Sequence, residues 1–252
     1  MKHTGTVYLV GAGPGDPELL TLRAARLIQN AALIVHDGLV DPAILALANA
    51  DTRLISVAKI RSKHTLPQDQ INALLVREAR AGRDVVRLKG GDPFIFGRGG
   101  EEMEDCLAAG VPVHVVPGIS AANGAAAASG IALTHRDSAS IVSFVAGQCK
   151  ELKDQDWAGL AGQNRTLVIY MGVNTAPQIA EKLIEDGLTP DMPVAIIENA
   201  ARPEMRVLRG PLAALPELVG RHNVTSPALI VIGEVTARAD NIVGQMALEA
   251  AQ

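Results

Sequence analysis

The chain has 252 residues, of which 48% are hydrophobic, 20% charged and 2% aromatic, and its formal net charge is −4. The acidic balance argues against a nucleic-acid-binding surface, which is normally basic, and so few aromatic side chains leave little for bases to stack on. No apolar run reaches membrane-spanning length, and the N-terminus lacks a signal-peptide pattern. We therefore expect a cytoplasmic protein without nucleic-acid or membrane partners.

The first half of the chain alternates strand-like and helix-like segments. In chain order, the strands are expected at 6–10, 32–35, 52–57, 85–88 and 113–116, and the helices at 17–30, 42–48, 69–81, 99–109 and 120–129. Asp16 and Pro17 fit the N-cap and first position of the first helix. This alternation predicts a mostly parallel sheet with helical crossovers.

In the second half of the chain, strands and helices no longer alternate regularly. Its expected strands are 140–146, 166–170, 194–198, 207–210 and 228–232, its expected helices are 175–186 and 211–221, and residues 147–165 are polar and irregular. We expect a boundary within 135–140, which gives an N-terminal α/β domain over 1–137 and a C-terminal α/β domain over 138–252.

The most informative stretch is Val85–Glu102, in which strand formers lead into Gly90-Gly91-Asp92-Pro93 and then Gly97-Arg98-Gly99-Gly100. Glycine has no Cβ, so such loops let the backbone approach a ligand closely. Asp92 could accept hydrogen bonds from ligand hydroxyls or face a cationic group, and Arg98 could meet a carboxylate in fork geometry. The alternative is an ordinary Gly-rich turn.

A second Gly-rich turn, Gly11–Asp16, follows the first expected strand. It resembles a dinucleotide-binding turn, and Asp37 lies near the place of a ribose-binding acid. The third glycine comes one position early, however, and Pro14 removes a backbone donor where a phosphate would bind. A tight turn that shapes a ligand pocket is the better interpretation.

Basic side chains gather around the expected strand ends. Lys59, Arg61, Lys63 and His64 share one loop, and Arg87, Lys89, Arg98 and Arg136 lie at other strand ends or loops. Because the carboxyl ends of parallel strands meet at one edge of a sheet, this pattern favours a polyanionic small molecule as ligand. A solvated basic loop is the alternative.

Cysteine and histidine usage points to no metal or disulfide. Cys106 and Cys149 form neither a disulfide framework nor a metal-binding pattern, and no His-rich spacing is present. Both thiols are expected to be structural or incidental, in a reducing compartment.

Taken together, these segments resemble the tetrapyrrole methylases from about residue 6 to about residue 236, in order. The matching pieces are residues 10–24, 35–40, 63–72, 85–102, 115–122, 130–137, 170–172 and 226–235. The sequence KGGDPFIFGRGGEE together with THRD is typical of the branch that methylates uroporphyrinogen III. The resemblance implies two α/β domains, a mostly parallel N-terminal sheet and a mixed C-terminal sheet, with an active-site trough between them and usually a homodimer.

The resemblance also implies a reaction. Methyl groups would pass from S-adenosylmethionine to ring carbons of uroporphyrinogen III, giving precorrin-2 by way of precorrin-1 for sirohaem or cobalamin biosynthesis, with S-adenosylhomocysteine as by-product and without a metal. A methyltransferase acting on a later precorrin, or a non-enzymatic protein that binds S-adenosylmethionine or a tetrapyrrole, are the alternatives.

Site residues follow from the matching positions. The donor contacts would be Pro14, Gly90, Gly91, Asp92, Ile95, Ser120, Ala121, Met171 and Ala200, with Ala228 as a weaker addition. Asp37 corresponds to the family's proposed proton acceptor and Lys59 to its proton donor, although Lys59 could equally bind a substrate carboxylate. Candidates for binding substrate carboxylates are Arg61, Lys63, His64, Arg98 and Arg136. His36, Ala58 and Ile60 depart from residues common in the family, which affects the substrate geometry more than donor binding.

Overall fold

The computed structural model describes residues 3–58, 66–148, 157 and 159–239. The chain divides into two compact units, Met1–Ala121 and Ala122–Gln252. Each unit is built around its own five-stranded sheet. No helix in these described ranges is long and apolar enough to cross a membrane.

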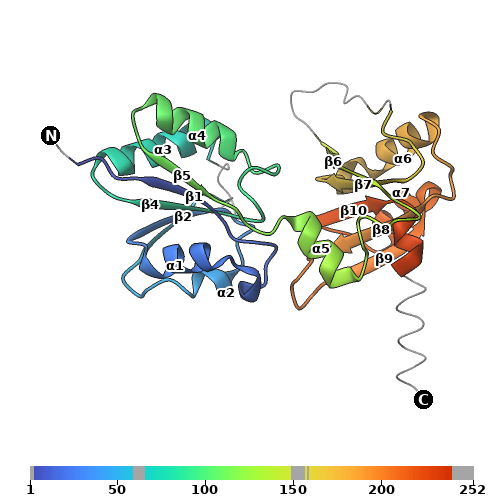
Figure 1. Ribbon diagram of the computed structural model, residues 1–252, viewed down its shortest axis with the longest axis horizontal. Helices are drawn as coiled ribbons and strands as arrows, with labels where there is room; N and C mark the ends of the chain where they lie inside the picture. Colours follow the sequence, from blue (N-terminus) through green and yellow to red (C-terminus); the bar gives the residue numbers. More distant parts are fainter. Residues whose placement is uncertain (1–2, 59–65, 149–156, 158, 240–252) are drawn as a thin grey trace, which may run out of the picture. The chain divides into compact units, whose positions relative to one another are not determined.

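The first unit contains a parallel sheet between two layers of helices (Figure 1). Its strands are β1 (Val7–Gly11), β2 (Leu33–His36), β3 (Arg53–Ser56), β4 (Val85–Lys89) and β5 (Val113–Val116), in the order β3-β2-β4-β1-β5. The helices α1 (Leu22–Asn30) and α2 (Pro42–Leu45) cover one face, and α3 (Gln68–Arg80) and α4 (Gly99–Ala108) cover the other. The predicted parallel sheet with helical crossovers is confirmed.

Alternating strand residues fill the two core layers of this unit. Leu9 and Val35 pack with the α3 and α4 side, whereas Val10 and Ile34 pack with the α1 and α2 side. All four side chains are fully buried. A strand that is covered on both faces needs such a continuous apolar run, because successive side chains point to opposite faces.

The helix predicted over 17–30 is interrupted. Pro17–Leu19 forms a 3-10 turn, labelled η1, which Asp16 caps by accepting a hydrogen bond from the Glu18 amide at 2.8 Å. Leu20 is extended, and α1 then begins at Leu22, where the Thr21 hydroxyl accepts from the Ala24 amide at 3.2 Å. Thr21 therefore acts as a second N-cap, which starts a new helix where the apolar spacing predicts a continuous one.

The second unit contains a mixed sheet. Its strands are β6 (Ile141–Ala146), β7 (Arg165–Tyr170), β8 (Pro193–Glu198), β9 (Arg206–Pro211) and β10 (Ala228–Ile232), in the order β6-β7-β10-β8-β9. β6 and β7 are parallel, and the other pairs are antiparallel. The mixed C-terminal sheet is thus confirmed, and with it the two-part α/β fold class.

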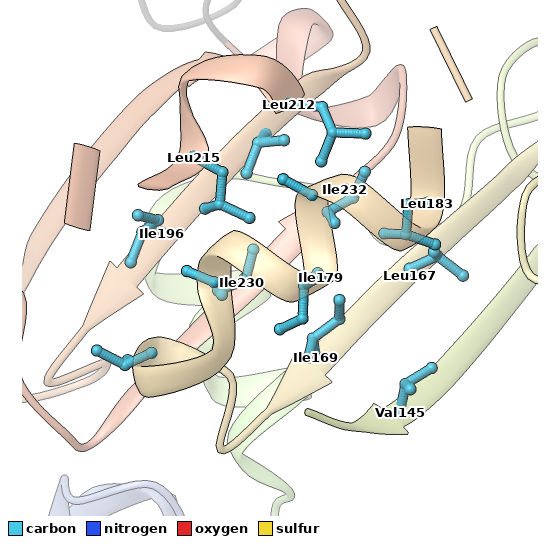
Figure 2. Close-up of a cluster of buried hydrophobic side chains, with 14 of the residues drawn as sticks. Val145, Leu167, Ile169, Ile179, Leu183, Ile196, Leu212, Leu215, Ile230 and Ile232 are labelled. Atoms are coloured by element: carbon cyan, nitrogen blue, oxygen red, sulfur yellow. The ribbon is translucent and has the colours of Figure 1, made fainter. Parts of the chain in front are cut away.

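The second unit has three helices among the described residues. They are α5 (Ala121–Ser129), α6 (Ala176–Glu185) and α7 (Leu215–Arg221), with the 3-10 turns η2 (Val173–Thr175) and η3 (Leu212–Ala214) before α6 and α7. Ile179 and Leu183 of α6 meet Ile169 of β7 and Ile230 of β10 in one apolar cluster (Figure 2). These four side chains are fully buried, so burial of this layer is the main force that holds α6 on the sheet.

The division between the units falls earlier than the boundary expected at 137–138. Residues of α5 bond to the second sheet: the Ala122 amide donates to the Tyr170 hydroxyl at 3.1 Å, and Arg209 Nη2 donates to the Ser129 carbonyl at 3.4 Å. The regular strand–helix alternation continues through α5, so the pattern alone does not reveal that this helix packs with the second half.

Candidate functional site

The chain segments that carry the predicted motifs follow the strands of the first sheet. Gly11–Asp16 begins at the last residue of β1, Asp37 follows β2, the Gly90–Arg98 loop follows β4, and Pro117–Ser120 follows β5. Since these strands are parallel, their carboxyl ends share one edge, where open α/β proteins place their ligands. The structure thus brings the predicted motifs of the first unit to a common edge.

Three backbone segments meet there with no room for side chains. Gly13 and Gly91 form an antiparallel bridge, with N···O distances of 3.1 and 2.7 Å, and both have positive φ. A Cβ on Gly11 would lie 2.5 Å from the Gly118 nitrogen, and one on Gly118 would lie 2.3 Å from the Gly91 carbonyl oxygen. Glycine is required at Gly11 and Gly118 by this close approach, and at Gly13 and Gly91 by the left-handed backbone.

Asp92 fixes this convergence. Its Oδ1 accepts from the Phe94 amide at 2.8 Å and its Oδ2 accepts from the Gly118 amide at 3.0 Å, so one carboxylate joins the β4 loop to the β5 turn. A carboxylate oxygen has two lone pairs, so each oxygen keeps capacity for a ligand donor. Asp92 therefore has a structural role, and the binding role predicted for it stays a prediction.

The other donor candidates of the first unit lie around these turns. Pro14 follows the bridged Gly13, Gly90 precedes Gly91, and Ala121 has its amide 3.5 Å from the position that a Cβ of Gly91 would take. Ile95 is half-buried within the β4 loop, and the buried Ser120 directly precedes α5. These residues lie on the segments that follow β1, β4 and β5, and their ligand contacts stay predictions.

Asp37 is paired with buried cations. Arg87 Nη2 donates to Asp37 Oδ1 at 2.5 Å, and Lys89 Nζ lies 3.8 Å from Asp37 Oδ2. Arg87 and Lys89 are only 1% and 2% exposed. The expectation that these two cations belong to a basic surface for a polyanion is therefore wrong: they point from β4 into the interior, where Glu102 of α4 is their second partner.

The remaining predicted substrate residues belong to different parts of the chain. Arg98 is exposed and pairs with Glu101 through two hydrogen bonds of 2.8 and 2.7 Å, and the guanidinium lowers the Glu101 pKa. Arg136 is exposed in a turn of the second unit that the His135–Ala139 bridge closes. Lys59, Arg61, Lys63 and His64 lie outside the described residues.

In the second unit, strand register brings the other donor candidates to one edge of the sheet. Ala228 pairs with Glu198, and Leu229 pairs with Tyr170, so Ala228 lies beside the strand ends that lead into Ala200 and Met171. Backbone strain accompanies them: φ is 56° at Met171, 51° at Asn199 and 57° at Ala201. Residues other than glycine adopt this conformation at a cost, and such positions cluster at functional sites.

A buried carboxylate holds this edge together. Glu198 is 2% exposed, and its Oε1 accepts from the amide and hydroxyl of Thr225 at 2.9 and 2.7 Å. Its Oε2 accepts from Arg206 Nε at 2.6 Å. Burial alone would raise the Glu198 pKa, but the bonds from Thr225 and the Arg206 charge outweigh burial and lower it.

We expect Glu198→Gln to lower the free energy of unfolding at pH 7 by about 2 kcal/mol, because a charge-assisted buried hydrogen bond is lost. The folded-state pKa lies below the ordinary value of 4.5, so this contribution is present above pH 4.5 and is lost as the pH falls through the folded pKa. Urea unfolding at several pH values should therefore show the wild-type and variant curves converging in acid. Glu185→Gln, in an exposed pair with Lys182, is the control and should have little effect at any pH.

Two site features were not predicted. Glu101 and Glu102 were not assigned as partners of Arg98 and of the β4 cations, although both lie in the GRGGEE motif. The available signal was two basic residues within a strand that is otherwise apolar on both faces.

Cys106 lies next to this network and is fully buried. Burial, together with the charges of Glu102 and Asp105, raises the Cys106 pKa to about 11, which argues against a nucleophilic role. Among the described residues, no group of three or more histidine, cysteine, aspartate and glutamate side chains could hold a metal ion.

The fold and this glycine-lined edge define an α/β protein of the tetrapyrrole methylase class. The family model described as Tetrapyrrole (Corrin/Porphyrin) Methylases matches residues 6–216. The chain therefore belongs to the tetrapyrrole methylase family.

Two curated relatives are named siroheme synthase. The protein from Gluconacetobacter diazotrophicus is 53% identical over 233 residues, which cover 92% of this chain and 50% of the relative. The protein from Methylococcus capsulatus is 54% identical over 233 residues, which cover 92% of this chain and 49% of the relative. The chain thus spans about half the length of these relatives.

A solved structure resembles the chain over nearly its whole length. It is a uroporphyrin-III C-methyl transferase from Thermus thermophilus, complexed with S-adenyl homocysteine. It is 43% identical, has a TM-score of 0.79, and the match covers 92% of this chain and 93% of that one.

Proposed function

We propose that the chain is a C-methyltransferase that transfers methyl groups from S-adenosylmethionine to uroporphyrinogen III, giving precorrin-2 by way of precorrin-1. The observation that carries the proposal is the match to the Thermus thermophilus uroporphyrin-III C-methyl transferase. That structure is complexed with S-adenyl homocysteine, and the match covers almost all of both chains. The names of the siroheme synthase relatives support the same substrate class.

The carboxyl edge of the first sheet fits the methyl donor. Gly90 and Gly91 are only partly buried, and Asp92 keeps lone pairs for a hydroxyl or an ammonium group. Pro14, Ile95, Ser120 and Ala121 would supply shape and backbone contacts. In the second unit, the proposed donor contacts are Met171, Ala200 and Ala228. Their common sheet edge and the positive φ angles at and beside them support this proposal.

S-Adenosylmethionine supplies a methyl group on a sulfonium, which already carries a good leaving group. The protein then has to align the donor with the pyrrole carbon, which is a proximity effect, and to accept the proton that the pyrrole system must lose once the new carbon–carbon bond has made it cationic and S-adenosylhomocysteine has left. We assign the proton-accepting role to the Asp37 carboxylate, which is 29% exposed at its side chain and directly follows β2, at the same sheet edge as the Gly-rich loops. Lys59 is proposed as proton donor on the family resemblance.

The substrate is a polycarboxylate, so cationic side chains would bind it. Arg98, Arg136, Arg61, Lys63 and His64 remain the proposed contacts. Arg98 already pairs with Glu101, so a substrate carboxylate would have to compete with Glu101 or share the guanidinium with it. A homodimer and metal-free chemistry complete the proposal on the same resemblance, and a cytoplasmic location is proposed on the composition and cysteine usage of the sequence.

The test is anaerobic incubation of the purified protein with S-adenosylmethionine and uroporphyrinogen III, followed by mass spectrometry and absorbance of the tetrapyrrole. We expect two methyl groups to be gained. Omission of the donor is the control, and addition of a chelator should leave the rate unchanged. No methyl gain would overturn the substrate assignment, and tight donor binding in that case would favour a later precorrin or a binding role.

A further inference from the structure

Four charged side chains of the first unit form one network beneath the candidate site. Arg87 and Lys89 of β4 and Glu102 of α4 have side chains that are 0–3% exposed, whereas the side chain of Asp37 is 29% exposed. Removing a charge from water costs several kcal/mol, so a buried ion pair is weak evidence for stability. Within this set, only the Asp37 side chain reaches solvent. This difference suggests that the buried members serve to hold the Asp37 carboxylate in position.

The contacts form a chain that links Glu102 of α4, through Arg87 and Lys89 of β4, to Asp37. Glu102 Oε1 accepts from Arg87 Nε at 2.9 Å and from Lys89 Nζ at 2.9 Å. Gln68, the first residue of α3, adds a longer bond to the same oxygen at 3.3 Å. The other side of each cation faces Asp37: Arg87 Nη2 at 2.5 Å and Lys89 Nζ at 3.8 Å. Each cation therefore bridges the two carboxylates.

The network is balanced in charge, with two cations and two carboxylates among these four residues. Burial and the neighbouring Arg87 charge lower the Lys89 pKa against the opposing pull of Asp37 and Glu102, so the two carboxylates support the charged form of Lys89. Without the charge on Glu102, Asp37 would be the one counter-charge left for both cations within this set. Its carboxylate would then be held more tightly and be less available to accept a proton.

We infer that Glu102, acting through Arg87 and Lys89, is a positioning residue that orients and frees the Asp37 carboxylate for proton transfer. This inference rests on the proposed function, in which Asp37 accepts the ring proton. It adds a role for three residues that touch neither donor nor substrate in that proposal. The alternation of β4 supports it, since Arg87 and Lys89 share the face that meets α4, while Val86 and Leu88 fill the opposite apolar layer.

The test compares Glu102→Gln with Glu78→Gln. Glu78 is a matched control: it is also buried in this unit and pairs with Arg53, Arg77 and Arg83. Arg53 begins β3 and Arg83 precedes β4, so Glu78 serves the opposite, amino edge of the sheet. Both variants remove one buried charge and keep the side-chain size, but only Glu102 contacts the partners of Asp37.

We expect Glu102→Gln to lower kcat for methyl transfer about 10- to 100-fold, as positioned acid–base groups contribute 100-fold or more. The KM for uroporphyrinogen III and the Kd for S-adenosylmethionine should stay within about twofold, because Glu102, Arg87 and Lys89 touch neither ligand in the proposed site. Glu78→Gln should keep the wild-type kcat even where it lowers the unfolding temperature. Equal losses of kcat in both variants would overturn the inference, because they would show a general effect of lost stability.

A double-mutant cycle identifies the route of the effect. In an Asp37→Asn background, Glu102→Gln should cause little further loss of kcat, because residues that act as a unit are non-additive. Additive losses, or a wild-type kcat in Glu102→Gln, would overturn the inference while the wild-type enzyme still methylates its substrate. A wild-type protein that transfers no methyl group would instead overturn the proposed function, and the inference with it.

A second variant and a structural readout cover the case in which Glu102→Gln does not fold. Lys89→Met removes one bridging cation, keeps the Arg87–Glu102 pair, and should show the same non-additivity with Asp37→Asn. A crystal structure of either variant should show a changed Asp37 side-chain position with unchanged Gly90–Asp92 backbone. An unmoved Asp37 carboxylate would contradict the positioning role.

Discussion

Gly118→Ala is expected to abolish S-adenosylmethionine binding, raising the Kd more than about 100-fold, and to lower the free energy of unfolding by about 3 kcal/mol, the upper range for overpacking. The added Cβ would lie 2.3 Å from the Gly91 carbonyl oxygen and 2.9 Å from Gly11 Cα. These neighbours are backbone atoms, so no side-chain rotation can relieve the clash. The β4 loop has to move away, and the bond from the Gly118 amide to Asp92 is lost with it.

Isothermal titration with S-adenosylmethionine and urea unfolding measure the two effects separately. Gly220→Ala is the control, because a Cβ there meets nothing within 4 Å and the residue lies inside α7. Alanine should be neutral or stabilising by up to about 1 kcal/mol at such a helical position. Wild-type donor affinity in a folded Gly118→Ala protein would show that the glycine convergence is not part of the donor site.

The main architecture could be predicted because the local signals agree with the tertiary structure. Buried parallel strands need continuous apolar runs, and the helices between them carry one apolar face, so alternation of the two patterns predicts the parallel sheet. The mixed pairing of the second sheet was expected from the family resemblance and not from these local patterns. The break in the first helix was not, because Thr21 is both compatible with a helix interior and able to cap a new helix.

The motif loops of the site could be predicted, but their contacts could not. GAGPGD, KGGDP and PGIS each follow a strand, which places them at one edge once the sheet is known to be parallel. Contact between Gly11, Gly91 and Gly118 requires in addition that β4 and β5 flank β1, and this order results from packing across the whole unit.

The charge network shows the same limit more strongly. From the sequence, Arg87 and Lys89 are predicted to be surface cations, because isolated basic residues at a strand end are usually solvated. Their burial depends on Glu102, which is 15 residues from Arg87 and reaches it only when α4 packs on the sheet. Alternation along β4 predicts that both point to one face, but the sequence does not say which face contains a carboxylate.

Asp37→Asn is the second change with a large expected effect, a 100- to 10,000-fold lower kcat for methyl transfer, which is about the contribution of a general acid–base group. Asparagine has nearly the same shape and can still accept a hydrogen bond from Arg87, but it cannot take up the ring proton. Donor binding should be retained within about twofold, because the two hydrogen bonds that hold the Asp92 carboxylate come from the Phe94 and Gly118 amides and do not involve Asp37. Single-turnover methyl transfer and donor titration measure these two quantities.

Asp84→Asn is the matched control, since Asp84 is an exposed aspartate at the amino edge of the same sheet, where its Oδ1 accepts from the Thr6 amide at 2.7 Å. It should keep the wild-type kcat. Asp37→Asn also removes a counter-charge from Arg87 and Lys89, so the free energy of unfolding has to be measured beside the rate. A folded, donor-binding Asp37→Asn protein that is as active as wild type would show that another group accepts the proton. A protein that loses kcat and keeps both fold and donor binding separates proton acceptance from the structural role of the ion pair.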